Sequence, residues 1–255
     1  MGYELRNLFR SRWVVIYTLL YLLLTDALFR FGGSGDRVLL SLTNVVLLLI
    51  PLVSIVFGTM HLYHSREFIE LLLAQPVARG ALFAGLYGGL ALPLAAGFAV
   101  GVGIPFALHG GLASDPGRLA VLVLVGVLLT LVFTAAAFLI SLWFQDRAAG
   151  LGAAIVLWLA TAVLYDGLLL LGIAVLGDWP LERPVLIATL LNPVDLGRVL
   201  LILRFDLSAL SGYTGAVFAR FFGSGLGSGV AIGVLLLWAT LPLALGAWRF
   251  RQKDF

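Results

Sequence analysis

Residues 38–60 form a run of 23 residues that contains no charged side chain and is mostly apolar. A helix that crosses the hydrocarbon core of a membrane needs roughly 20 such residues, because that core is about 30 Å thick. Buried helices of water-soluble proteins rarely continue for this length without a polar face. The run therefore predicts a transmembrane helix.

Runs of the same kind recur along nearly the whole chain. Six are long enough to span a membrane, namely residues 13–29, 38–60, 80–108, 119–145, 148–176 and 229–248. The composition agrees, because 62% of the 255 residues are hydrophobic and only 11% are charged. We expect an all-α, polytopic membrane protein with six transmembrane helices in a single transmembrane domain, residues 1–255.

The positively charged residues predict the orientation of the chain, because short cytoplasmic loops are enriched in lysine and arginine. If the N-terminus is cytoplasmic, the short inner segments carry nine of these residues: Arg6, Arg10, Arg12, Arg66, Arg79, Arg147, Arg249, Arg251 and Lys253. The short outer loops then carry three, Arg30, Arg37 and Arg118. The long segment 177–228 carries the other four, but long translocated segments have little influence. Both termini are predicted to be cytoplasmic.

The chain lacks the residues that several classes of function require. The chain has no cysteine, its only lysine is Lys253, and its only methionines are Met1 and Met60. A phosphate-binding Walker loop needs a Gly-Lys-Ser/Thr string, and Cu(I) prefers cysteine and methionine. We therefore expect this chain to bind no cofactor or metal by itself and to catalyse no reaction. Membrane anchoring explains the net charge of +3, since no basic face with interleaved aromatic residues predicts nucleic-acid binding.

The first inner loop is predicted to contain a short helix over residues 65–75. Ser65 can cap its start, and the helix should stop at Gln75, because Pro76 disfavours helical backbone in the residue before it. Such a helix would lie at the cytoplasmic surface of the membrane.

The two sides of this predicted helix differ in character. Phe68, Leu71 and Leu72 fall on one face at the spacings i, i+3 and i+4, whereas Glu67 and Glu70 lie on the other side. The acidic side is suited to a protein partner. The alternative is an interfacial loop that binds no partner.

The N-terminal residues 1–12 carry Arg6, Arg10 and Arg12 beside apolar residues. This pattern predicts a helix at the membrane interface whose arginines lie toward anionic lipid headgroups. Membrane lipid is therefore an expected partner. The alternative is a sequence that only directs membrane insertion.

Asp166 is the acidic residue placed within the fifth apolar run. A carboxylate within a span is costly and usually faces a partner or a watery cavity, which makes it a functional candidate. Counted from Ala148 at about 1.5 Å per residue, Asp166 lies roughly 27 Å along the helix, near the outer boundary. An Asp at the interface, beside Tyr165, is therefore the competing interpretation.

The outer segment 177–228 contains a helix start. Asn192 can act as N-cap, Pro193 fits the first helical position, and Asp195 fits the third. The helix would reach Arg204, which is too short to span a membrane, so it is either re-entrant or lies on the outer surface. Asn192, Asp195, Arg198 and Arg204 are our candidates for a surface that binds an outer partner or gates release. The alternative is a structural cap.

Three strings resemble a known family. The loop REFIELLLAQPVARGALFAG resembles the first inner loop of the membrane subunits of type-2 ABC exporters, and LYDGLLLLG and LNPVDLGRVLLIL resemble the NosY-type permeases within that group. The resemblance implies that the inner loop is a coupling helix that docks on a separate ATPase. The residues it assigns to coupling are Arg66, Glu67, Phe68, Glu70, Leu71 and Gln75.

The resemblance also implies a half-transporter in the bacterial inner membrane that forms a homodimer of twelve spans. ATP and Mg would be bound by a cytoplasmic ABC ATPase subunit. In NosY-type systems the outer partner is a periplasmic protein of NosD type, and the task is delivery of copper or a sulfur species for maturation of nitrous oxide reductase. An ABC exporter permease for another substrate, a secondary transporter or channel, and a membrane scaffold are the alternatives.

Overall fold

In the computed structural model, the described residues of the chain, 12–32, 35–110, 116–175, 182–204 and 225–253, form helices and short connections. Six helical stretches are long and apolar enough to cross a membrane: Trp13–Gly32, Gly35–His64, Arg79–Leu108, Pro116–Trp143, Arg147–Val175 and Gly227–Gln252. This confirms the all-α fold with six spans. The interfacial helix predicted over residues 1–12 lies outside the described residues, except for Arg12.

Four helices form the centre of the molecule: α2 (Arg12–Gly32), α3 (Gly35–His64), α5 (Arg79–Leu108) and α7 (Pro116–Trp143). The packing of α3 against α7 is the most extensive, and α2 packs mainly against α5. Gly58 of α3 and Gly126 of α7 let the helices approach closely, because a Cβ at Gly58 would lie 2.6 Å from the Ala137 Cβ and one at Gly126 would overlap Phe98. The last span, α13 (Gly225–Gln252), packs on the other side of α7.

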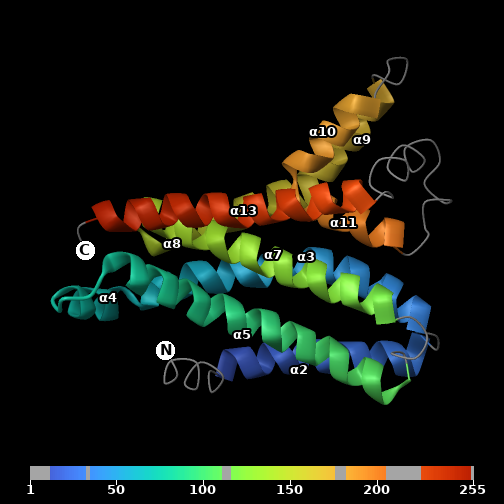
Figure 1. Ribbon diagram of the computed structural model, residues 1–255, viewed down its shortest axis with the longest axis horizontal. Helices are drawn as coiled ribbons and strands as arrows, with labels where there is room; N and C mark the ends of the chain where they lie inside the picture. The colour runs from blue at the N-terminus through green and yellow to red at the C-terminus, as the bar shows by residue number, and fades with distance from the viewer. Residues whose placement is uncertain (1–11, 33–34, 111–115, 176–181, 205–224, 254–255) are drawn as a thin grey trace.

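The two ends of the bundle carry different short helices (Figure 1). One end holds α4 (Arg66–Leu73), the start of α2 and the end of α13. We call it the α4 end. The opposite end holds α11 (Pro193–Arg204) and is called the α11 end. The described start of the first span and end of the last therefore lie at the same end, as an even number of spans requires.

The fifth span is not a uniform α-helix. It consists of α8 (Arg147–Leu159), a π-helix η1 (Ala160–Leu164) and α9 (Tyr165–Val175). Beyond the π-helix, α9 and its neighbour α10 (Glu182–Leu191) leave the bundle together at an angle (Figure 1). Only 6% of the most apolar window of this span is buried within the chain, against 61% for the span that α7 forms.

The structure confirms the short helix that begins after Asn192. α10 and α11 meet at a bend of 112°, the geometry of a broken span or a re-entrant loop. α11 does not lie flat on the surface, because most of it is buried against α7, α3 and α13. Of the two arrangements predicted for this segment, the re-entrant one agrees with this bend and burial.

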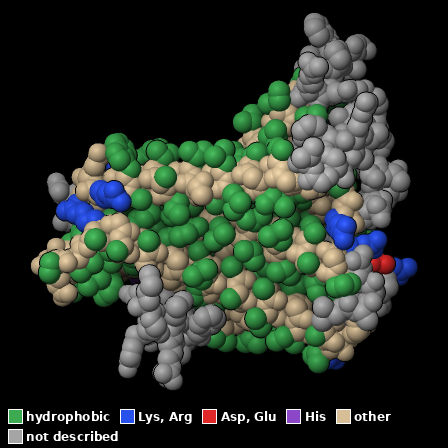
Figure 2. Space-filling view, viewed as in Figure 1, with side chains coloured by type: hydrophobic (Ala, Val, Ile, Leu, Met, Phe, Trp, Pro, Cys, Tyr) green, Lys and Arg blue, Asp and Glu red, His purple; other side chains and the backbone are tan. Residues whose placement is uncertain are grey.

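The side chains form the pattern expected of a membrane protein. On the face shown in Figure 2, apolar side chains cover the middle of the molecule, and lysine and arginine side chains gather near its two ends. A surface of this kind suits a hydrocarbon layer in the middle with polar headgroups at both ends.

Candidate functional sites at the two ends of the bundle

The exposed face of α4 combines acidic and apolar side chains. Glu67, Phe68, Glu70 and Leu71 are all exposed, Phe68 to 48% and Leu71 to 70%. Among the described residues, none forms an ion pair with either glutamate. We call these four residues the α4 surface. It offers both an apolar contact area and negative charges that can pair with a cationic partner.

The inward face of α4 differs from the one predicted. Ile69 is fully buried, and Leu72 and Leu73 pack partly buried against the core, whereas Phe68 and Leu71 point outward. The string REFIELLL contains two overlapping sets of apolar residues at the spacing i, i+3, i+4, and the fold uses the second set. Leu72 belongs to both sets, so periodicity could not choose between them.

The start and end of α4 also depart in detail from the prediction. Ser65 occupies the N-cap position, but its hydroxyl donates to the His61 carbonyl of the preceding turn at 2.8 Å rather than capping α4. The helix ends at Leu73, and the amides of Ala74 and Gln75 close a turn before Pro76. Gln75 is exposed just beyond the helix.

Arg66 anchors α4 to the turn between α7 and α8. Its guanidinium donates to the carbonyls of Gln145 at 2.9 Å and Phe144 at 3.2 Å, and it lies over the Tyr63 ring at 4.5 Å from the centroid. The Tyr63 hydroxyl donates to the Phe144 carbonyl at 2.9 Å. Carbonyls at a helix C-terminus lack partners within the helix, so positive side chains stabilise them. The guanidinium of Arg66 is therefore held by the bundle of its own chain.

The end of α13 is fixed in the same way. Arg79 Nη1 donates to the carbonyls of Arg251 at 2.9 Å and Lys253 at 3.0 Å, and the Lys253 ammonium donates to the Leu142 carbonyl at 2.9 Å. Burial lowers the pKa of Lys253, and the charges of Arg66 and Arg249 lower it further. The ends of α3, α7 and α13 and the start of α5 are thus joined beside α4.

Gly150 of α8 completes this junction. A Cβ at Gly150 would overlap the Tyr63 hydroxyl, so only glycine lets α8 pass this close to α3. Two residues later, a Cβ at Gly152 would meet nothing within 4 Å.

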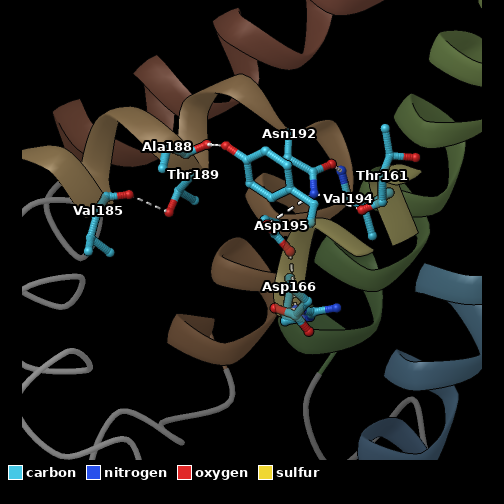
Figure 3. Close-up of polar contacts among 10 residues, drawn as sticks. Thr161, Asp166, Val185, Ala188, Thr189, Asn192, Val194 and Asp195 are labelled. Atoms are coloured by element: carbon cyan, nitrogen blue, oxygen red, sulfur yellow. Dashed lines mark hydrogen bonds and ion pairs between the residues drawn. The ribbon is translucent and has the colours of Figure 1, made fainter. Parts of the chain in front are cut away.

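Between the middle of the bundle and its α11 end, Asn192 joins the bent helix pair to the fifth span (Figure 3). Its Nδ2 donates to the Thr161 carbonyl at 2.8 Å and to Asp195 Oδ2 at 3.0 Å, and its Oδ1 accepts from the Val194 amide at 3.1 Å. The last contact confirms Asn192 as the N-cap of α11. Thr161 lies in the π-helix, and its carbonyl serves here as the acceptor for a side chain of another element.

Asp166 pairs with Arg198. Arg198 Nη1 lies 2.6 Å from Asp166 Oδ1 and 3.1 Å from Asp195 Oδ1, so one guanidinium bridges a half-exposed and a largely buried carboxylate. The structure thus brings together four of the predicted residues, Asn192, Asp195, Arg198 and Asp166. Arg204 is exposed at the end of α11 and is not part of this group.

Two aromatic residues hold α10 in place next to this group. The Tyr165 hydroxyl donates to the Ala188 carbonyl at 2.6 Å, and the Trp238 indole donates to the Leu190 carbonyl at 3.2 Å. Sequence reasoning missed both contacts, as well as the anchoring of Arg66, because each partner is a backbone carbonyl that carries no signature in the sequence. Among the described residues, no three His, Asp or Glu side chains come together to hold a metal ion.

Comparison with known proteins assigns this chain to a family. The sequence profile described as ABC-2 family transporter protein matches residues 1–255, the whole chain. The chain belongs to the ABC-2 transporter family. It is therefore a membrane-spanning permease subunit and is not itself catalytic. Membership of this family implies a partner ATPase subunit.

Two curated relatives are similar over nearly the full length of the permease. The probable ABC transporter permease protein NosY of Pseudomonas aeruginosa is 29% identical over 262 residues, which cover 96% of this chain and 91% of that protein. The protein of the same name from Stutzerimonas stutzeri is 27% identical over 259 residues, which cover 94% and 86%. The relationship to NosY is thus distant.

Gly150→Ala should disrupt the junction at the α4 end, because the added methyl group displaces the Tyr63 hydroxyl from the carbonyls of the α7–α8 turn. We expect a loss of about 1–3 kcal/mol in the free energy of unfolding, measured in detergent. Gly152→Ala is the matched control and should leave stability unchanged or slightly increase it, since alanine favours helix. Equal effects of the two substitutions would contradict the role of Gly150.

Asn192→Leu should destabilise the junction of α10, α11 and the fifth span, because it leaves the Thr161 carbonyl and the buried Val194 amide without their partner. Each unsatisfied group costs about 1–3 kcal/mol. The melting temperature, followed by intrinsic tryptophan fluorescence, should fall. Thr189→Val is the control, because the buried Thr189 hydroxyl donates only to the Val185 carbonyl of its own helix. A fall for Thr189→Val as large as that for Asn192→Leu would argue against a specific role for Asn192.

Proposed function

We propose that this permease couples ATP hydrolysis by a separate cytoplasmic ABC ATPase subunit, which binds ATP and Mg²⁺, to movement of its membrane spans. The α4 surface is the docking site. The observation that carries this proposal is the exposure of Phe68 and Leu71 beside Glu67 and Glu70. Apolar anchors flanked by charges are typical of protein interfaces.

In this proposal the α4 end is cytoplasmic. Arg66, Arg79, Arg147, Arg249, Arg251 and Lys253 belong to this end, in agreement with the bias of short inner segments toward arginine and lysine. The α11 end then faces the periplasm, and both termini are cytoplasmic in a bacterial inner membrane.

Motion enters through α4 and passes along α3. Only Ser65 separates the end of α3 from the start of α4, and Arg66 ties that point to the end of α7. The same two helices, α3 and α7, contact α11 at the opposite end. A displacement of α4 by the ATPase subunit is thus transmitted to the bent pair through helices that pack against each other along their length.

At the α11 end, Asn192, Asp195, Arg198 and Asp166 set how α11 meets the fifth span, and Arg204 remains exposed for contact with an outer partner. Arg198 acts within the permease, because both carboxylates that it bridges belong to the chain itself.

We further propose that the permease works as a homodimer of twelve spans. The fifth span is nearly uncovered within one chain, and α9 and α10 extend away from the bundle with apolar side chains on their surfaces, including Leu168, Leu171 and Ile187. A second copy can bury these side chains, and membrane lipid covers the rest.

The relationship to NosY supports a narrower assignment. We propose that the permease serves maturation of nitrous oxide reductase together with a periplasmic partner of NosD type, by passing a sulfur species or transmitting motion. The absence of cysteine and the presence of only two methionines favour these roles over direct conduction of copper. An exporter for another substrate would share the same coupling mechanism.

Replacing Glu67 and Glu70 with lysine, or Phe68 and Leu71 with alanine, should detach the ATPase subunit. Hot-spot residues at interfaces contribute about 2 kcal/mol or more each, so we expect at least a tenfold loss of affinity for either pair. Co-purification and permease-stimulated ATP hydrolysis are the measurements.

Leu108→Ala is the control for these variants. Leu108 is 77% exposed and lies at the α11 end of α5, so its loss should leave the ATPase complex intact. If both α4 variants bind and stimulate the ATPase as the native permease does, the docking role of α4 is wrong.

A further inference from the structure

Within the described part of the chain, five buried hydroxyl groups inside the bundle form no well-formed hydrogen bond. They belong to Tyr17, Tyr21, Thr25, Ser54 and Thr134, none of which is more than 3% exposed. We call these five residues the hydroxyl seam. The seam lies inside the bundle and plays no part in the proposed docking or coupling.

The two threonines and the serine of the seam do not form the hydrogen bond that is most readily available to them within a helix. In a helix, such a hydroxyl can donate to the carbonyl four residues earlier, and Thr43, Thr59 and Thr130 in the same bundle do so at 2.7–3.0 Å. The hydroxyls of Thr25, Ser54 and Thr134 do not. Their orientation therefore leaves a donor available inside the bundle.

The seam has members on three helices, α2, α3 and α7. Tyr17, Tyr21 and Thr25 are spaced four apart and share one face of α2. The Tyr17 hydroxyl lies beside those of Tyr21 and Thr130, and Thr130 lies half-way along α7. No well-formed hydrogen bond satisfies the hydroxyl of Tyr17 or Tyr21.

Ser54 and Thr134 continue the seam between α3 and α7. Ile50 and Gly58, four residues on either side of Ser54, both contact α7, so Ser54 faces α7 as well. Thr134 lies opposite Gly58, since a Cβ added at Gly58 would be 3.6 Å from the Thr134 carbonyl oxygen. The seam therefore has members both on the α2 face and at the α3–α7 contact.

A buried hydroxyl without a partner costs about 1–3 kcal/mol of stability, so five such groups together would destabilise the folded protein considerably. Water is the ligand that fits them, because it donates and accepts, and a buried water needs two to four polar partners. The neighbouring hydroxyls of Tyr17, Tyr21 and Thr130 supply three oxygens. We propose that ordered water molecules occupy the interior of the permease along the hydroxyl seam and bridge α2 to α3 and α7.

Radiolytic hydroxyl-radical footprinting of the full chain in lipid nanodiscs tests this proposal directly, because water bound next to a side chain generates the radical that oxidises it. Corrected for intrinsic reactivity, Tyr17 and Tyr21 should be oxidised several-fold faster than Phe98 and Phe106, which are equally buried. Equal rates for the tyrosines and phenylalanines would overturn the proposal.

An isosteric substitution gives an independent test. Thr134→Val removes the hydroxyl but keeps the shape, so it should lower the melting temperature by about 2–4 °C if the hydroxyl binds water. If the site is dry, the same substitution relieves an unsatisfied group and should stabilise the protein. Thr43→Val is the control, because the Thr43 hydroxyl bonds only to its own helix. A Thr134→Val variant at least as stable as the native protein would overturn the proposal.

Discussion

The close packing of α3 against α7 is the contact on which the rest of the permease depends. At the level of Gly126, Phe98 and Ile50 fill the space that a larger residue would occupy, and nearer the α4 end Gly58 lies against Ala137. In a membrane, water does not drive helices together, so tight contact between small residues supplies much of the association. Tyr63 and Phe144 close this contact at the α4 end. α11 rests on the same two helices at the other end.

This arrangement explains why polar residues gather where they do. The permease has few charged side chains, and several at the α4 end satisfy carbonyls that helices leave free. Arg66 and Lys253 do so at the end of α7. The uncharged Asn192 does so at the π-helix. The α4 surface is different, because its charged and apolar side chains face outward and no described residue of the chain pairs with its glutamates. That contrast distinguishes the proposed docking surface from the structural junctions.

Much of the fold could be predicted from the sequence, because run length and helix-start chemistry are local properties. The six apolar runs correspond to six helices, and the string NPVD begins a helix with Asn192 as its cap. The inward face of α4 could not be predicted, since Phe68 and Ile69 each begin an apolar set with helical spacing. The partner of Asp166 lies 32 positions further along the chain, and the acceptor of Asn192 is a backbone carbonyl of the π-helix. Contacts of this kind depend on tertiary packing, which produces no periodic pattern in the sequence.

The central claim is that the ATPase subunit docks on α4. Site-specific photo-cross-linking in cells that contain both subunits tests it most directly, with p-benzoylphenylalanine placed at Leu71 in α4 or at Leu108 at the α11 end of α5, both exposed. The account predicts an adduct between the permease and the ATPase subunit from position 71 and none from position 108. An adduct from position 108 without one from position 71 would contradict both the docking site and the proposed orientation.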